Sequence, residues 1–543
     1  MIRSIRGWGT DDVDVDARPA QVPAAPVPAG PPGWAVGVVA AVAALARLVY
    51  LFGFAPLQNA GEGHTDAYHH WQIGYLTQQI GLGHGPRLWD LKGQEYFWGT
   101  LHPLLLSVLF TFTGHDIIVP RLLSAAFGTL IVALVFLLAH RYFGLGAAIG
   151  AAAFAALSPL AIFSDTAGLT DPLGAALCLL GVWLAPRRQF LAGLVLALAA
   201  TARAEAWVFG GLIVLLLYWA RPALSGRGRV LRGWLTGMAA YLLFLWGQTG
   251  NPIYPFYWNY LVSASGHGLP TTITAAQQAI RPLFVAGALV LGAAFAAVLA
   301  RRPAVTPLLG YALASGGAVC ALFAFTSFIT QWDGWVWRDR VIAYPLELVV
   351  TVGLGGLFAG LARLGGRARH VLPLAAGLGL ALATQSLWPN LQSTYHATDS
   401  LYALAVQAGT QIGAASRAGG GGVVMVPDDR PTVTYTMVTD GAVPATEIQS
   451  QHYDPLFYLP AGSAPRSDPA RMAVVWRCWI HDSHTRLLVI DTTHPDYAAL
   501  VRDHADWFSE VGEVPQYNWV LYRVHAPAAP SAAECAAAAA LAG

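Results

Sequence analysis

The amino-acid sequence predicts a polytopic α-helical membrane protein with about 11 transmembrane helices and a C-terminal extracytoplasmic α/β domain. Of its 543 residues, 55% are hydrophobic and only 11% are charged, whereas a soluble domain carries about 25% charged residues. So few charges cannot cover a water-facing surface of this size. The lipid bilayer must therefore be part of the solvent. The net charge of +1 gives no sign of a nucleic-acid partner.

The chain begins with a polar, Pro/Ala-rich segment, residues 1–33, which has no signal-peptide core and predicts a disordered cytoplasmic tail. A transmembrane domain at 34–389 follows. A spanning helix needs about 20 apolar residues, and candidates lie at 34–56, 118–139, 145–163, 172–186, 189–202, 205–220, 234–248, 283–300, 305–327, 341–362 and 371–388. The apolar run 101–113 is too short, and we expect a helix half-immersed in the outer leaflet.

The distribution of arginine predicts the orientation, because cytoplasmic loops carry an excess of Lys and Arg. With the N-terminus inside, the inner ends carry Arg3, Arg6, Arg141, Arg187, Arg188, Arg221, Arg227, Arg229, Arg232, Arg301, Arg302, Arg363, Arg367 and Arg369. The outer connections carry fewer, namely Arg87, Lys92, Arg121, Arg203, Arg281, Arg338 and Arg340. The sequence thus predicts a multi-pass plasma-membrane protein whose N-terminus is cytoplasmic and whose C-terminal part lies outside.

Residues 390–528 differ in character from the apolar part. Short apolar runs, GVVMV at 422–426, MAVVWRCW at 472–479, LLVID at 487–491 and NWVLYRV at 518–524, alternate with helix-like segments such as 399–416. This alternation predicts an α/β domain, followed by an Ala-rich tail at 529–543. Cys478 and Cys535 could form a disulfide outside the cell, but the Ala-rich surroundings of Cys535 favour two unpaired cysteines.

Polar residues gather in the outer connections, where the membrane does not explain them. The stretch GEGHTDAYHHWQ, residues 61–72, holds Glu62, His64, Asp66, His69 and His70. Later outer segments hold Asp165, Asp171, Arg203, Glu205, Asp333, Arg338, Asp339 and Arg340, and Arg47 lies inside the first span. A charge at mid-membrane costs about 2.5–3.5 kcal/mol on insertion scales. A site at the outer membrane surface is the economical inference.

The types of residue indicate the chemistry. A carboxylate beside histidines can act as a general base, and arginines at membrane depth, Arg47 among them, suit a phosphate. Aromatic side chains such as Tyr254 suit sugar faces or the lipid interface. Together they fit sugar transfer from a lipid-phosphate donor.

Alternatives remain open for these residues. Asp66 and Asp171 could instead cap helices, and the arginines of the fifth outer loop, Arg338 and Arg340, could pair with the aspartates beside them. Arg203 and Glu205 are expected to form a structural pair. His64, Asp66, His69 and His70 could together bind a metal ion, so a divalent cation is left open as a cofactor.

Several segments, taken in order, resemble the integral-membrane GT-C glycosyltransferases. These segments are ALARLVYLFGF, HTDAYHHWQIGYL, EYFWGTLHPLLLSVLFTFTGHDIIVPRLLSAAFGTL, SPLAIFSDTAGLTDPLGAAL, TARAEAW, GNPIYP and RDRVIAYPLELVV. More narrowly, residues 34–390 resemble the bacterial relatives of protein O-mannosyltransferases and aminoarabinose transferases. The stretch His102-Pro103-Leu104 lacks one proline of the family's His-Pro-Pro-Leu, and Asp66 has no adjacent Glu.

The resemblance implies a GT-C enzyme that inverts the anomeric carbon and moves a sugar from a polyprenyl-phosphate donor to a glycan, lipid or protein acceptor. Asp66 would be the catalytic base, and Asp165 or Asp171 would organise the acceptor or a cation. The leaving phosphate would be held by Arg338 or Arg340, with Arg281 or Lys92, and Arg47 is a further candidate. We expect the substrates to contact Glu62, His64, His69, His102 and Tyr254.

Three other functions compete with this hypothesis. A transporter or flippase for a lipid-linked substrate predicts repeated halves and broken helices near the midplane, and the sequence has no internal repeat. TDAYHHWQIGYL also resembles the catalytic subunit of oligosaccharyltransferases, but the outer domain has no Trp-Trp-Asp-Tyr-Gly motif. A non-catalytic assembly protein would not need Asp66.

Overall fold

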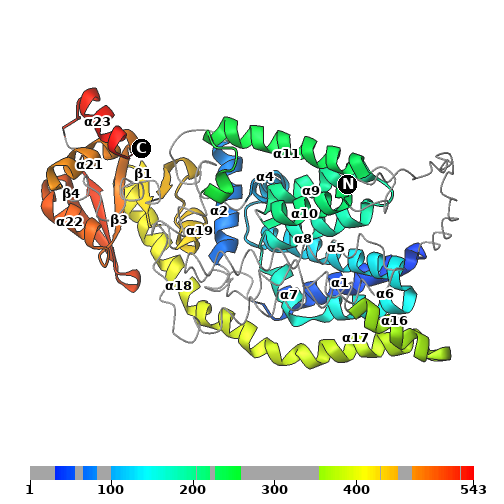
Figure 1. Cartoon of the computed structure of the whole chain (residues 1–543). Helices are drawn as coiled ribbons and strands as arrows, with labels where there is room; N and C mark the ends of the chain where they lie inside the picture. The colour runs from blue at the N-terminus through cyan, green and yellow to red at the C-terminus, as the bar shows by residue number, and fades with distance from the viewer. Residues whose placement is uncertain are drawn as a thin grey trace, which may run out of the picture.

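The structure, a computed structural model, consists of a helical part and an α/β part joined by one long helix (Figure 1). It describes residues 31–55, 65–81, 99–203, 205–219, 227–257, 354–427, 430–450, 468–525 and 528–542. The joining helix is α18 (Trp388–Ala418), which continues from the last helix of the helical part to the first strand of the sheet. The predicted domain boundary at 390 therefore falls inside a helix.

The helical part is built from short and long apolar helices. They are α1 (Gly33–Gly53), α2 (Thr65–Ile80), α4 (Leu101–Thr113), α5 (Ile118–Phe143), α6 (Leu145–Leu157), α7 (Pro159–Thr166), α8 (Asp171–Leu184), α9 (Gln189–Ala202), α10 (Glu205–Trp219), α11 (Arg227–Thr249), α16 (Gly355–Leu364) and α17 (Val371–Ala383). Of the described residues, those of α1, α5 and most of α11 form helices long and apolar enough to cross a membrane. Helices α6 and α7 form a further span if their 57° bend is counted as one crossing.

Helices lie at the positions of the predicted spans wherever both are described, but several of them are shorter than a membrane span. The predicted span 145–163 is the bent α6–α7 pair, and 101–113 is the separate short helix α4. Helices α8 and α9 have only 14 residues each. The predicted spans 283–300 and 305–327, and most of 341–362, lie outside the described residues.

One end of the helical part gathers the ends of helices that are predicted to be cytoplasmic. The guanidinium of Arg141, at the end of α5, donates to the Trp183 carbonyl at the end of α8 (2.8 Å). The start of α6 touches the α16–α17 turn, because a Cβ built on Gly146 would lie 2.7 Å from the Arg369 carbonyl oxygen. This end lies away from the sheet (Figure 1).

Glycine lets α6 and α17 approach closely. A Cβ built on Gly150 would lie 2.6 Å from the Pro373 carbonyl oxygen, and one built on Gly377 would lie 2.3 Å from the Gly150 carbonyl oxygen. Helices in a membrane gain no hydrophobic energy by associating, so small residues that allow close backbone packing hold them together.

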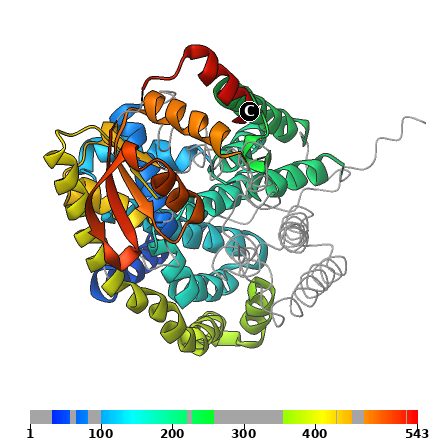
Figure 2. The same cartoon turned by 90° about the vertical axis from the view of Figure 1, so that its left-hand side faces the viewer.

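The α/β part contains a five-stranded sheet with helices on both faces (Figure 2). The strands are β1 (Val423–Val426), β2 (Ile448–Ser450), β3 (Thr485–Asp491), β4 (Phe508–Val514) and β5 (Trp519–Val524), in the order β2-β1-β3-β5-β4. Strands β2, β1 and β3 are parallel, whereas β5 and β4 are antiparallel to their neighbours. The apolar runs at 422–426, 487–491 and 518–524 coincide with β1, β3 and β5, whereas the run at 472–479 lies in a helix, α21 (Pro469–Ser483).

Alternate residues of the central strands enter two different cores. Val424 and Val489 pack toward α18 and α19 (Pro431–Thr439). Met425 and Leu488 pack toward α21 (Pro469–Ser483) and α22 (Pro495–Asp503). A strand buried on both faces reads as a continuous apolar run, which is why these segments lack polar alternation.

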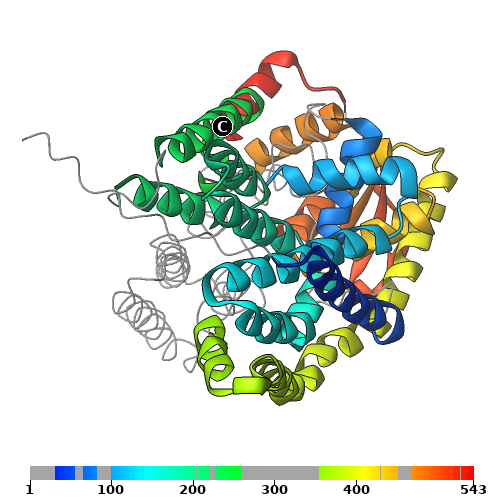
Figure 3. The same cartoon turned by 90° about the vertical axis from the view of Figure 1, so that its right-hand side faces the viewer.

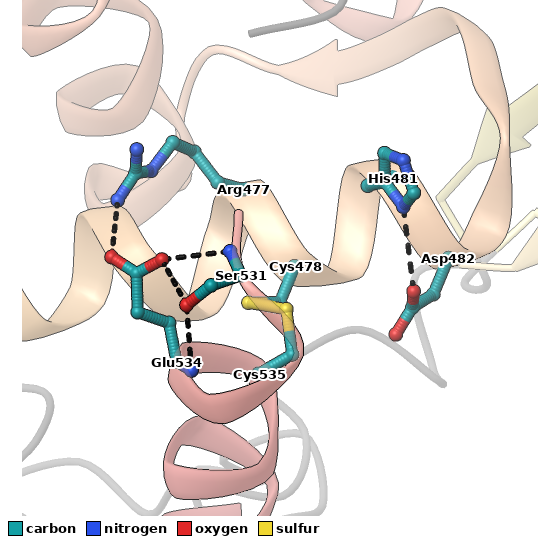
Figure 4. Close-up of a disulfide and its surroundings, with 7 residues drawn as sticks. All are labelled: Arg477, Cys478, His481, Asp482, Ser531, Glu534 and Cys535. Atoms are coloured by element: carbon teal, nitrogen blue, oxygen red, sulfur yellow. Dashed lines mark hydrogen bonds and ion pairs between the residues drawn. A yellow bond between two sulfur atoms is a disulfide. The ribbon is translucent and has the colours of Figure 1, made fainter. Parts of the chain in front are cut away.

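The Ala-rich tail forms a helix, α23 (Ala532–Ala542), which is joined to α21 by a disulfide between Cys478 and Cys535 (Figure 4). The Cα atoms of the two cysteines are 5.5 Å apart. Our expectation of unpaired cysteines was wrong. The tail is an ordered helix with a capped first turn, and this helix carries Cys535 next to Cys478. Ser531 and Glu534 bond each other's backbone N–H groups at 3.2 and 2.8 Å, a capping box.

We expect Gly150→Ala to lower the free energy of unfolding by about 1–3 kcal/mol, the usual cost of overpacking, because the new methyl group would meet the Pro373 carbonyl. Gly379→Ala on α17 is the matched control, since no described atom lies within 4 Å of its added Cβ. Thermal unfolding of both variants in detergent measures the difference. A Gly150→Ala protein as stable as Gly379→Ala would contradict the close helix contact.

Candidate active site

Helix α2 carries the polar stretch of the first outer connection. Asp66 lies in its first turn and is partly exposed, and His69 and His70 follow three and four residues later, so both neighbour Asp66 on the helix surface. A Cβ built on Gly168 would lie 3.3 Å from the Ala67 Cβ atom. The first turn of α2 therefore lies against the turn between α7 and α8, which is the predicted second outer loop.

A pair of buried histidines lies beside this turn. The rings of His70 and His102, the latter at the start of α4, meet edge to face with centroids 5.1 Å apart, and each residue is 1% exposed. Burial lowers the pKa of His102 to about 3. Burial also lowers the pKa of His70 well below its ordinary value, and the positive charge of Arg203 adds to this effect. Both imidazoles are thus neutral at neutral pH.

Arg203 pairs with Asp171 near these histidines. The Nη2 atom of Arg203, just after α9, lies 3.5 Å from Oδ1 of Asp171, the first residue of α8, and both side chains are buried. Thr170 fixes the same junction by donating its hydroxyl to the Ala202 carbonyl (3.2 Å). We had expected Arg203 to pair with Glu205; the structure gives it Asp171 as a partner, and the Glu205 side chain lies outside the description.

A second buried ion pair lies deeper in the helical part. Arg47 of α1 donates from Nε and Nη2 to Oδ2 of Asp165 in α7, at 2.9 and 2.5 Å. Its Nη1 atom donates to the carbonyls of Ala43 (3.1 Å) and Ala156 (3.4 Å). All three nitrogens therefore bind protein atoms. This geometry supports a structural role for Arg47 and Asp165 and does not support the predicted phosphate and catalytic roles.

Arg121 is an arginine that the sequence reasoning placed outside but did not assign to the site. It lies in the first turn of α5, is fully buried, and donates from Nε to the Thr166 carbonyl (3.1 Å). Its Cγ atom would lie 3.3 Å from a Cβ on Gly168, the same glycine that contacts Ala67. The cost of a charge near the end of a span was the signal that could have identified it.

The α/β part contributes an aromatic contact to α2. The Tyr435 ring of α19 lies edge to face with the rings of Tyr68 (5.3 Å) and Trp71 (4.7 Å). Its hydroxyl accepts a hydrogen bond from the Ile117 backbone N–H (3.4 Å), and burial, with Asp116 nearby, raises its pKa. Sequence reasoning missed Tyr435 because nothing local marks it.

The structure describes only some of the remaining predicted site residues. Tyr254 packs against the hydrophobic cluster that contains Tyr68 and Trp71, and His69 is buried on α2. Glu62, His64, Lys92, Arg281, Arg338 and Arg340 lie outside the described residues. Within the described part, no group of three or more His, Cys, Asp or Glu side chains is arranged to hold a metal ion.

Comparison with known proteins identifies related structures but no related sequences. No protein-family model and no curated protein matches the chain. ArnT from Cupriavidus metallidurans in the apo state matches with a TM-score of 0.54 at 14% identity, over 92% of this chain and 99% of that chain. The same ArnT bound to undecaprenyl phosphate gives 0.49 at 13% identity over the same shares. An Archaeoglobus fulgidus oligosaccharyltransferase in complex with Zn and sulfate gives 0.44 at 13% identity, over 90% and 73%.

The match to apo ArnT extends over almost the whole of both chains and shows the fold. This chain has the helical membrane fold of ArnT, an aminoarabinose transferase of the GT-C type. The predicted helical fold is confirmed as the fold that this chain shares with ArnT. The number of spans and the side of the membrane on which the sheet lies stay predictions.

We expect the free energy of unfolding to fall as the pH drops below 6.5, the ordinary pKa of histidine. In the unfolded chain His102 binds a proton near that pH, whereas in the folded protein burial lowers its pKa to about 3. This one group contributes a slope of at most about 1.4 kcal/mol per pH unit. His102→Gln should remove its share and leave that of His70. Thermal unfolding in detergent at neutral pH and at about pH 5 tests this. An unchanged slope in His102→Gln would contradict a neutral buried imidazole.

Proposed function

We propose that the protein is an inverting glycosyltransferase that moves a sugar from a polyprenyl-phosphate donor to an acceptor at the extracytoplasmic face, with Asp66 as general base. The convergence at the first turn of α2 is the observation that carries this proposal. Three segments far apart in sequence meet there, and they are the segments predicted to lie outside. ArnT, whose fold this chain shares, has been crystallised with undecaprenyl phosphate, which supports a lipid-linked donor.

Asp66 is the aspartate that best suits the base. Asp165 and Asp171 are both buried and each is paired with an arginine, so neither is placed to take a proton from an incoming hydroxyl. Asp66 is partly exposed and lies beside two histidines on the helix surface. We therefore assign Asp165 and Asp171 to positioning the helices around the site.

The donor phosphate needs cations that are not already engaged. Arg47, Arg121 and Arg203 each bind protein acceptors, and all three are buried. We therefore keep the phosphate-binding role for the predicted cations of the other outer connections, Arg281, Arg338, Arg340 and Lys92.

The reaction follows from these roles. The acceptor hydroxyl attacks the anomeric carbon while Asp66 takes its proton, and the bond to the phosphate oxygen breaks with inversion at that carbon. The phosphate leaves as an anion, so cations fixed beside it stabilise the developing charge. The acceptor of this reaction is a glycan, a lipid or a protein.

Two features support a location of the α/β part outside the cell. A disulfide between Cys478 and Cys535 suits an oxidising compartment. The described arginines predicted to be cytoplasmic lie at the opposite end of the helical part; they include Arg141, Arg187, Arg188, Arg363, Arg367 and Arg369.

We expect Asp66→Asn to reduce transfer of a labelled sugar from polyprenyl phosphate by roughly 10²–10⁴-fold, the usual contribution of a general base, with melting temperature and donor binding unchanged. Asp482→Asn is the control, because this carboxylate is 74% exposed on α21 and should keep full activity. Release of label from the lipid is the readout. Full turnover by Asp66→Asn would remove the base from the mechanism, and movement of labelled lipid across the bilayer without release would favour a transporter.

We expect Cys478 and Cys535 to react with a membrane-impermeant maleimide in intact cells only after reduction of the disulfide. The Cys478→Ser/Cys535→Ser variant is the control and should lose the labelling. Labelling that requires opening of the cells would place the α/β part in the cytoplasm.

A further inference from the structure

An apolar groove runs along the helical part between α1, α5 and α6. Its volume is about 290 Å³, and its walls include Val38 and Val42 of α1 and Ile149 and Ala153 of α6. It extends along α6 from Leu145 to Ala156, about 16 Å at 1.5 Å per residue. This length matches one leaflet of hydrocarbon, which is about 15 Å thick.

The groove has two different ends. At one end, Ala156 lines the groove and its carbonyl accepts a hydrogen bond from Arg47. At the other end lie Trp34, which is 72% exposed, Leu145 and Leu374. This second end is where α1 begins, and Figure 3 views the molecule from that side.

Cations surround the second end. Leu374 lies one helical turn after His370, at the start of α17. The exposed residues Arg367 and Arg369 lie in the connection before α17, and exposed Arg363 lies in the last turn of α16. The Arg369 backbone lies against the start of α6, because a Cβ built on Gly146 would lie 2.7 Å from the Arg369 carbonyl oxygen. Residues 354–398 contain no acidic residue, so this segment contributes only positive charge to the mouth.

We propose that the groove binds one acyl chain of an anionic phospholipid, whose phosphate lies at the α16–α17 turn. The apolar walls favour a hydrocarbon chain over water, because they offer water no hydrogen-bond partners. Arginines at the mouth attract the phosphate, and basic pockets between membrane helices on the cytoplasmic side are known to bind such head groups. The charge of the mouth is the reason for an anionic rather than a zwitterionic lipid.

The site is separate from the proposed sugar-transfer site. Helix α2 and the α/β part lie at the opposite end of the helices (Figure 1), so the polyprenyl-phosphate head group would be at the other membrane surface. The lipid site therefore does not depend on the proposed enzymatic activity.

Native mass spectrometry of the purified full chain in detergent tests the site, with palmitoyl-oleoyl phosphatidylglycerol, the matching phosphatidylcholine and undecaprenyl phosphate as probes. Ala153→Trp fills the groove, and Arg367→Gln/Arg369→Gln removes charge from its mouth. The matched controls lie on α11, where Ala240, Arg229 and Arg232 are exposed. They are Ala240→Trp and Arg229→Gln/Arg232→Gln.

We expect the wild type to bind phosphatidylglycerol more tightly than phosphatidylcholine by roughly 25-fold, about fivefold for each of two arginines. The double Gln variant should abolish this preference, and Ala153→Trp should weaken both phospholipids while leaving undecaprenyl phosphate bound. Both controls should match the wild type. If Ala153→Trp lowers the melting temperature, Val38→Trp fills the groove from a 54% exposed position.

Three outcomes would overturn the proposal. Equal binding of the two phospholipids by the wild type would show that the arginines at the mouth do not attract an anionic head group. Unchanged phosphatidylglycerol binding in a groove-filled variant of normal stability would place the lipid elsewhere. Loss of undecaprenyl phosphate in that variant would assign the groove to the donor instead.

Discussion

Arg47 and Asp165 form an ion pair inside the helical part, and the arrangement of the outer end follows from it. The pair links α1 to α7, and a Cβ built on Gly128 of α5 would lie 2.2 Å from Asp165, so three helices meet around one carboxylate. Breaking a buried pair by removing one partner typically costs 3–5 kcal/mol, because the other charge is left uncompensated. The bend between α6 and α7 is held in place at this point.

The same requirement separates structural charges from reactive ones. In a medium without water, each buried charge needs a partner, and Arg203 and Asp171 supply one another at the outer end of α8 and α9. The mechanism that we propose assigns the chemistry to Asp66, in the partly exposed first turn of α2. Arg47 and Asp165 neutralise each other in this way, so we do not include them in the proposed site.

Helix α2 couples the two parts of the molecule. One of its faces packs on α4, where Gly74 contacts Leu106, and another packs on Tyr435 of α19. A rigid contact of this kind fixes the helix that carries Asp66 relative to both the membrane part and the α/β part.

The sequence by itself determined the helical membrane class and the strands at 422–426 and 487–491, because composition and apolar periodicity are local properties. It could not decide which charges pair. Arg203 pairs with Asp171, 32 residues earlier in the chain, and Tyr435 of the α/β part contacts α2. Cys535 joined Cys478 through a helix that composition had suggested was a loose tail. Such partners are set by distances between segments far apart in the chain, and only the packed tertiary structure fixes those distances.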